Sequence, residues 1–152
     1  MRWGKNPILW LSLACLGLIG PLWLPDTTVV EGDLLIYFPS FYSFPWEVSF
    51  NPNLAGGIST VINPQMGFFY PLAWILALDF HLMLPWYLAI HFLLASWGCF
   101  RWLECYFAGS IAPLTGALLY GCSGPAWSLV TKPDKLPGYA FLPWAMFGMA
   151  LL

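Results

Sequence analysis

The stretch at residues 85–103, PWYLAIHFLLASWGCFRWL, decides the fold class. Its only charged residue is Arg101, close to its end, and Glu104 follows directly after it. Because an α-helix rises about 1.5 Å per residue, a helix over this stretch is long enough to cross a hydrocarbon core of about 30 Å. The stretch therefore predicts a membrane-spanning helix whose charges lie at one end.

The rest of the chain is equally poor in charge. Of its 152 residues, 60% are hydrophobic and 8% are charged, whereas soluble domains carry about 25% charged residues. Aromatic residues reach 19%, and Trp and Tyr favour the membrane–water interface. The sequence therefore predicts an all-α fold, a polytopic transmembrane helical bundle with the lipid bilayer as its partner. A net charge of −2 provides no basic surface for nucleic acid.

Three other apolar runs predict further spans, at residues 7–24, 110–130 and 138–152. The first is longer than the apolar region of a signal peptide and lacks a small-residue cleavage site, so we expect an uncleaved helix. The second is rich in small residues, which let helices pack closely. The third reaches the end of the sequence without a polar tail. We therefore expect a single membrane domain, 1–152, that is a fragment of a longer chain.

Residues 25–84 are predicted to form an external loop with helices that lie in the membrane interface. Two prolines interrupt the aromatic stretch 34–50, and proline disfavours a continuous helix, so a kinked interfacial helix is expected there. The apolar stretch 67–82 is shorter than the roughly 20 residues that a span needs. It is predicted to be interfacial or re-entrant.

Charge placement predicts the orientation of the spans. Arg2 and Lys5 precede the first span, and positive residues beside a span favour the cytoplasmic side. The N-terminus is therefore expected in the cytoplasm, with Arg101 on the same side and Lys132 and Lys135 outside. The alternative topology counts residues 67–82 as a full span and inverts everything after it.

Acidic residues crowd between Asp26 and Glu47, directly after the first predicted span. Their centre is Glu31-Gly32-Asp33, where the glycine lets the backbone turn and two carboxylates meet the membrane edge. Partial desolvation there suits a general base or a site for a divalent metal. The alternative is an ordinary solvated loop.

His91 lies in the middle of the 85–103 stretch, where ionisable residues are unusual. It is a candidate ligand for haem or pigment, and the alternative is a histidine that bonds to a neighbouring helix. His81, beside Asp79, is expected at the interface. The four cysteines lie in apolar stretches without the spacing of a zinc site, so they are interpreted as small residues that fill helix contacts.

Four segments, taken in order, resemble the start of the YfhO-type bacterial membrane proteins. They are EGDLLIYFPSFYSF (31–44), NPNLAGGIS (51–59), NPQMGFFYPLAW (63–74) and GSIAPLTGALLYGCSGPAW (109–127). That family is similar to the GT-C superfamily of glycosyltransferases, which use polyprenyl-phosphate-linked sugars. The GD and NPQ..FYP elements are fairly specific together and weak singly.

The resemblance implies a bacterial inner membrane location and a polyprenyl-phosphate-linked sugar as the donor. In GT-C enzymes an acidic residue on the first external loop is the catalytic base, which implies Asp33, with Glu31 as the second candidate. Asn63, Gln65 and Tyr70 are the candidate residues of a sugar site. The cationic residues that hold the lipid phosphate are expected in later parts of such a chain.

Three functions follow as hypotheses. The first is the N-terminal module of a GT-C-like membrane glycosyltransferase, which acts at the outer face. The second is a non-catalytic scaffold subunit of a larger membrane complex. The third is a membrane subunit that binds pigment or haem through His91.

Overall fold

The computed structural model describes residues 6–24, 50–51, 58–59, 67 and 69–152. Within these ranges every element longer than two residues is helical, so the predicted all-α class is confirmed. The two short strands β1 (Phe50–Asn51) and β2 (Ile58–Ser59) pair antiparallel. The helices are α1 (Pro7–Ile19), η1 (Gly20–Trp23), η3 (Pro71–Ala77), α4 (Phe80–Glu104), α5 (Ile111–Gly121), α6 (Gly124–Ser128) and α7 (Leu136–Ala150).

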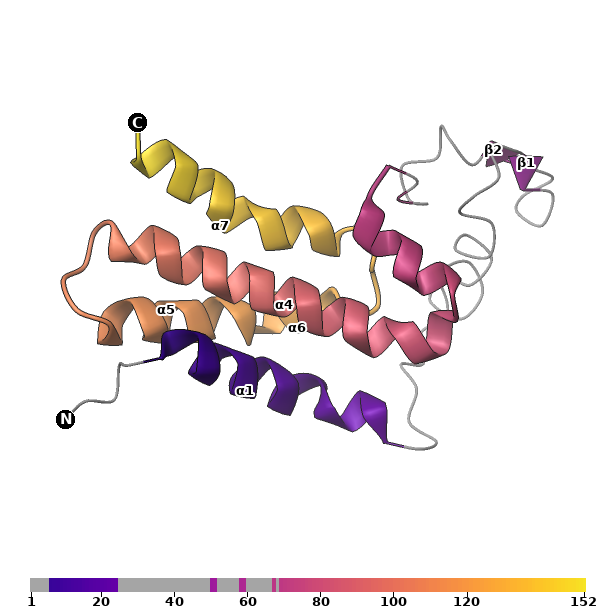
Figure 1. Ribbon diagram of the computed structural model, residues 1–152, viewed down its shortest axis with the longest axis horizontal. Helices are drawn as coiled ribbons and strands as arrows, with labels where there is room; N and C mark the ends of the chain where they lie inside the picture. The colour runs from indigo at the N-terminus through magenta and orange to yellow at the C-terminus, as the bar shows by residue number, and fades with distance from the viewer. Residues whose placement is uncertain (1–5, 25–49, 52–57, 60–66, 68) are drawn as a thin grey trace.

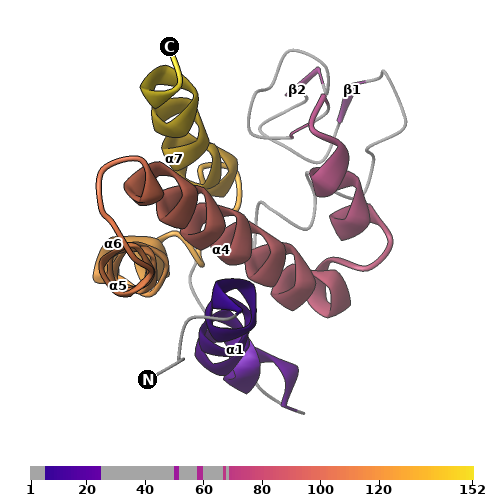
Figure 2. The ribbon, with the colours of Figure 1, turned by 60° about the vertical axis from the view of Figure 1, so that its left-hand side comes forward.

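Helix α4 is the centre of the bundle. Helices α1, α5 and α7 and the 3-10 helix η3 all pack against it (Figures 1 and 2). The chain direction alternates: α1 and the α5–α6 pair run one way, whereas α4 and α7 run the other way (Figure 1). Consequently Leu24, η3 and the α6–α7 connection lie at one end of the bundle, and Asn6 and Glu104 lie at the other.

The long helix begins earlier than residue 85, where the sequence placed the start of the span. Asp79 caps α4, because its side chain accepts a hydrogen bond from the Leu82 amide at 2.9 Å. Pro85 therefore lies inside the helix rather than at its start. The predicted interfacial stretch 67–82 thus divides at Asp79 into the seven-residue η3 and the first turn of α4. At about 2.0 Å per residue, η3 is too short to cross a bilayer.

The predicted span at 110–130 is not one continuous helix. It consists of α5, with 11 residues, and α6, with five, separated at Cys122 and Ser123. The physical reason is local: the Ser123 hydroxyl accepts a hydrogen bond from the Ala126 amide at 3.3 Å, and Pro125 follows in the first turn. A serine cap and an early proline favour the start of a new helix.

Among the described helices, only α4 is by itself long and apolar enough to cross a membrane. The apolar segment Pro7–Trp23 is shorter. It combines 13 α-helical and four 3-10 residues, which together rise about 28 Å. Helix α7 has 15 residues and begins two residues before the predicted span 138–152.

Glycines bring the helices into close contact with α4. A Cβ atom added at Gly98 would lie 2.7 Å from the indole ring of Trp144 on α7. That ring is held in place, because its Nε1 donates a hydrogen bond to the Leu94 carbonyl at 2.9 Å. On α5, an added Cβ at Gly121 would collide with Ser96 of α4. Small residues therefore set the distance between the helices, as in membrane bundles.

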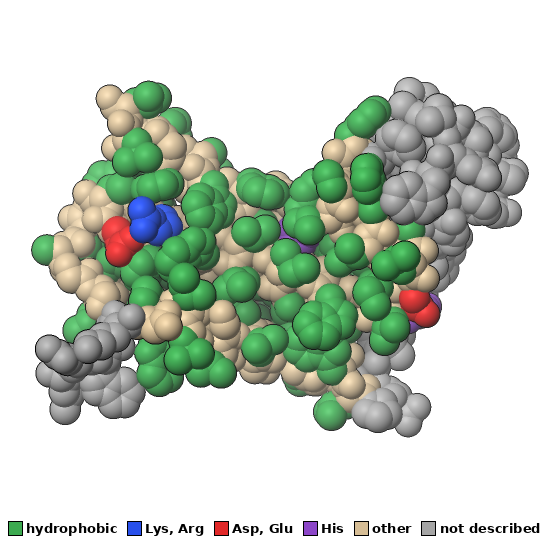
Figure 3. All heavy atoms as spheres, in the orientation of Figure 1, with side chains coloured by type: hydrophobic (Ala, Val, Ile, Leu, Met, Phe, Trp, Pro, Cys, Tyr) green, Lys and Arg blue, Asp and Glu red, His purple; other side chains and the backbone are tan. Residues whose placement is uncertain are grey.

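The outer surface of the bundle is also apolar. Helix α1 buries Leu11, Cys15 and Ile19 on one face and exposes large hydrophobic side chains on the other, namely Ile8, Leu9, Trp10, Leu13 and Leu16. In Figure 3 hydrophobic side chains cover the middle of the face shown, and charged side chains lie toward its two ends. A water-facing helix would carry polar residues on its outer side.

Candidate functional site

The fold brings together two of the residues that the sequence singled out. The Tyr70 hydroxyl lies 2.6 Å from Nε2 of His91, although the two residues are 21 positions apart in the chain. Their rings also contact each other, with centroids 5.5 Å apart. His91 is fully buried in α4, and Tyr70 is half-buried.

A tight turn places Tyr70 in this position. The Tyr70 amide donates to the Gly67 carbonyl at 2.8 Å, and Gly67 adopts a φ of +57°, a conformation that favours glycine. Tyr70 itself is extended and precedes η3, which starts with Pro71. An added Cβ at Gly67 would also lie only 3.0 Å from the Cβ of Ala73. The Tyr70 side chain thus reaches the middle of α4 from a non-helical segment.

The hydrogen bonds of His91 fix which ring nitrogen carries the proton. Nδ1 lies 2.7 Å from the Tyr87 carbonyl oxygen. A carbonyl can only accept, so Nδ1 is the donor. In a neutral imidazole the other nitrogen is then an acceptor, so the Tyr70 hydroxyl donates to Nε2.

The network continues to the connection between α6 and α7. The Tyr87 hydroxyl donates a hydrogen bond to the Pro133 carbonyl at 3.0 Å. The Tyr87 ring also packs on the His91 ring, with centroids 4.1 Å apart. The chain of contacts therefore joins the turn before η3, the middle of α4 and the 129–135 connection.

The surroundings of Tyr70 are aromatic. The ring of Phe141 on α7 meets the Tyr70 ring edge-on, with centroids 6.3 Å apart, and Phe141 is 44% exposed. Burial raises the pKa of Tyr70 to about 12. Its hydroxyl is therefore protonated at neutral pH and can donate a hydrogen bond to Nε2 of His91.

Four of the predicted site residues lie outside the described residues. These are Glu31 and Asp33, the candidate catalytic carboxylates, and Asn63 and Gln65, the candidate sugar-binding residues. Their roles stay predictions. Of the three residues that the sequence assigned to the sugar site, only Tyr70 is placed, and its partner is the histidine that the sequence assigned to another function.

The sequence offered a histidine bonded to a neighbouring helix as the alternative to a ligand, whereas the partners of His91 are Tyr87 on its own helix and Tyr70 in the turn before η3. Both ring nitrogens are engaged, so neither offers a lone pair to haem or pigment iron or magnesium in this arrangement. Within the described ranges, no three His, Cys, Asp or Glu side chains are grouped as a metal site. The divalent metal considered at Glu31 and Asp33 falls outside those ranges.

The sequence did not predict three other members of this network, Tyr87, Pro133 and Phe141. Tyr87 precedes His91 by four residues, and this spacing places both side chains on one face of a helix; it is a signal that the sequence does contain. Pro133 and Phe141 carry no comparable signal, because their proximity depends on how α7 returns along α4.

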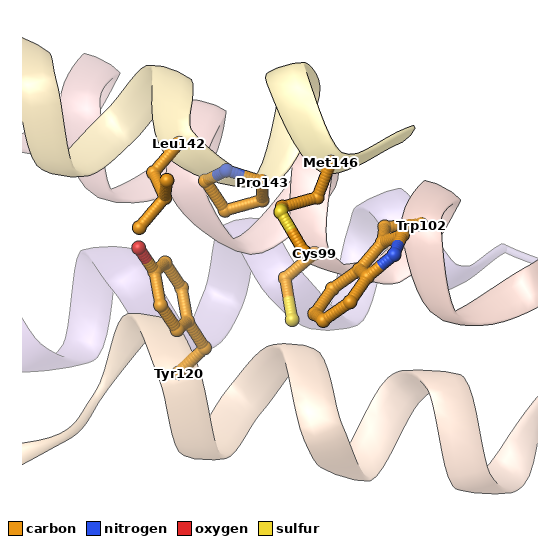
Figure 4. A pocket seen from close by; sticks show the side chains of 6 residues that line it. All are labelled: Cys99, Trp102, Tyr120, Leu142, Pro143 and Met146. Atoms are coloured by element: carbon orange, nitrogen blue, oxygen red, sulfur yellow. The ribbon is translucent and has the colours of Figure 1, made fainter. Parts of the chain in front are cut away.

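An apolar cavity of about 160 Å³ lies between α4, α5 and α7, away from Tyr70 and His91 (Figure 4). Its lining holds no charged side chain, and the Tyr120 hydroxyl donates to the Tyr139 carbonyl at 3.0 Å. The lining residues are Cys99, Trp102, Tyr120, Leu142, Pro143 and Met146. This cavity therefore offers apolar contact alone.

The chain was compared with protein-family models, with curated proteins and with solved structures, and none of them matches.

Proposed function

We propose that this chain is a multi-span module of a GT-C-like membrane glycosyltransferase, with a polyprenyl-phosphate-linked sugar as donor. The observation that carries the proposal is the Tyr70–His91 hydrogen bond, through which a side chain from a non-helical segment reaches the middle of a membrane-length helix. Inside a bilayer, such backbone is tolerated only where it is buried in protein or lines a cavity. Because Tyr70 is half-buried, the turn before η3 is assigned to the wall of a substrate site.

The membrane location is supported by the apolar outer surface. Helices α1 and α7 contain no charged residue, and each exposes large hydrophobic side chains. In water such a surface would lead to aggregation, whereas in a bilayer it contacts the apolar acyl chains of the lipid. The α1–η1 segment rises about 28 Å, close to the hydrocarbon thickness of about 30 Å.

The positions of charged and aromatic residues along α4 support the same placement. Asp79 lies at its start, and Arg101 and Glu104 form an ion pair of 3.6 Å at its end. Trp86 and Trp102, toward the two ends of the helix, are separated by about 24 Å along its axis, and Trp97 lies between them. Tryptophans at two levels, with charges beyond or beside them, are typical of a helix that spans a bilayer.

The alternating helix directions give the bundle two distinct ends. With the N-terminus in the cytoplasm, Arg101 lies on the cytoplasmic side, and Leu24, Gly67 and η3 lie toward the outer side. The segment with Glu31 and Asp33 is joined to the described chain at Leu24, on that outer side. We assign Asp33 as the catalytic base and Glu31 as the second candidate. Asn63, Gln65 and Tyr70 are assigned to the sugar site, at the outer face of a bacterial inner membrane.

A transfer assay tests this function. The protein expressed from its gene is reconstituted in vesicles with a radiolabelled polyprenyl-phosphate-linked hexose and with membrane extract as the source of acceptor. We expect the label to move from the lipid carrier to an acceptor only in vesicles that contain the protein. Intact donor after prolonged incubation, with the protein inserted and monodisperse, would contradict the proposal.

A scaffold subunit without chemistry is the second candidate. It is favoured by one observation: among the described residues, no carboxylate contacts Tyr70 or His91. A scaffold predicts stable insertion and no transfer in the same assay. The assay therefore separates the two functions.

A further inference from the structure

We propose that His91 is a positioning residue that turns the Tyr70 hydroxyl into an acceptor for a hydroxyl group of the sugar. This inference rests on the proposed glycosyl transfer. It assigns to His91 a part in substrate recognition in place of the haem or pigment ligation considered from the sequence.

The direction of the hydrogen bonds is the first step. The Tyr87 carbonyl accepts from Nδ1 of His91 at 2.7 Å, which leaves Nε2 as the acceptor for the Tyr70 hydroxyl at 2.6 Å. A tyrosine hydroxyl has one proton to donate. Since that proton is engaged in the hydrogen bond to His91, the Tyr70 oxygen offers only its lone pairs to any further partner.

The second step is that no other described residue occupies these lone pairs. His91 is the only hydrogen-bond partner of the Tyr70 hydroxyl among the described residues. His91 is fully buried, whereas Tyr70 is half-buried beside the half-exposed ring of Phe141. The oxygen of Tyr70 is therefore the part of this network that a ligand in the proposed site can reach.

The third step identifies the class of ligand group. An acceptor that cannot donate pairs with a donor, such as a sugar hydroxyl. It cannot pair with an ionised phosphate, because phosphate oxygens are acceptors themselves. Tyr70 thus contacts the sugar ring of the donor and not the phosphate of its lipid carrier.

The tautomer is tested first, by a measurement independent of activity. The chain contains two histidines, His81 and His91, so the His81→Gln variant leaves His91 as a single reporter. In ¹⁵N-histidine spectra of that variant in lipid nanodiscs at neutral pH, we expect a neutral ring with its proton on Nδ1. A proton on Nε2, or a charged ring, would overturn the inference whatever the activity.

Substrate recognition is tested with the polyprenyl-phosphate-linked hexose and its monodeoxy analogues. Loss of one hydrogen bond is expected to raise KM about tenfold for the parent donor in Tyr70→Phe. For one monodeoxy analogue, Tyr70→Phe should leave KM unchanged, because that analogue lacks the hydroxyl bound by Tyr70. Tyr106→Phe is the matched control, since Tyr106 is exposed at the opposite end of the bundle, and its KM should equal that of the unmodified protein.

A double-mutant cycle separates positioning from simple structural support. His91→Leu should raise KM for the parent donor, and adding Tyr70→Phe to it should have no further effect, because both changes remove the same contact. Additive effects, or an equal rise in KM for every analogue, would overturn the inference and leave the proposed function standing. If the unmodified protein transfers no sugar, the proposed function and the assigned ligand fail together, and the spectra still decide the tautomer.

Discussion

The Asp33→Asn variant is expected to lose sugar transfer by about 10²–10⁴-fold, the usual contribution of a general base. The amide keeps the size and much of the hydrogen bonding of the carboxylate, but it cannot take up the proton of the acceptor. The measurement is the initial rate of transfer from the polyprenyl-phosphate-linked donor. Expression and monodispersity in detergent should equal those of the unmodified protein.

Glu47→Gln is the matched control for this prediction. It removes the same charge from the predicted external loop, but it lies in the aromatic stretch 34–50, 14 positions after Asp33 in the sequence. We therefore expect only a mild effect on the rate. Normal turnover by Asp33→Asn would falsify the assignment of the base and would leave Asp33 as a loop residue of a scaffold.

The Gly98→Ala variant is expected to lose about 1–3 kcal/mol of unfolding free energy, the typical cost of overpacking. The added methyl would lie 2.7 Å from the Trp144 ring, and this ring cannot turn away without losing its hydrogen bond to the Leu94 carbonyl. Helices α4 and α7 would have to separate. The measurement is unfolding in mixed micelles, followed by tryptophan fluorescence.

Gly148→Ala provides the control on α7. Nothing lies within 4 Å of a Cβ added at Gly148, so the only effect is the higher helix propensity of alanine, a gain of up to about 1 kcal/mol. Equal stability changes in both variants would contradict the close contact between Gly98 and Trp144.

The helical class could be predicted from the sequence, because charge depletion and apolar length are properties of composition. Helix boundaries were less predictable. Pro85 was interpreted as a helix start, but Asp79 caps the helix first, and Pro85 lies inside it, where proline lacks the backbone N–H that a helix uses. The break at Ser123 was missed, because the apolar run 110–130 continues through it.

The candidate site, too, could be predicted only in part from the sequence. The sequence marked Tyr70 and His91 separately, through a motif and through a rare intramembrane histidine. Their contact depends on the turn at Gly67 and on how η3 packs against α4, which involve residues far apart in the chain. Local patterns carry no information about such packing. Hence the hydrogen bond on which the proposed role of His91 depends could be found only in the folded chain.

We propose that the chain spans a membrane several times, with the residues after α1 outside and the end of α4 inside. Single cysteines at positions 33, 63 and 101, in a background without the four native cysteines, test it with a membrane-impermeant thiol reagent applied to intact cells. We predict that positions 33 and 63 react from outside and that position 101 reacts only after the membrane is opened. Labelling of position 101 in intact cells, or failure to label position 33, would contradict this arrangement.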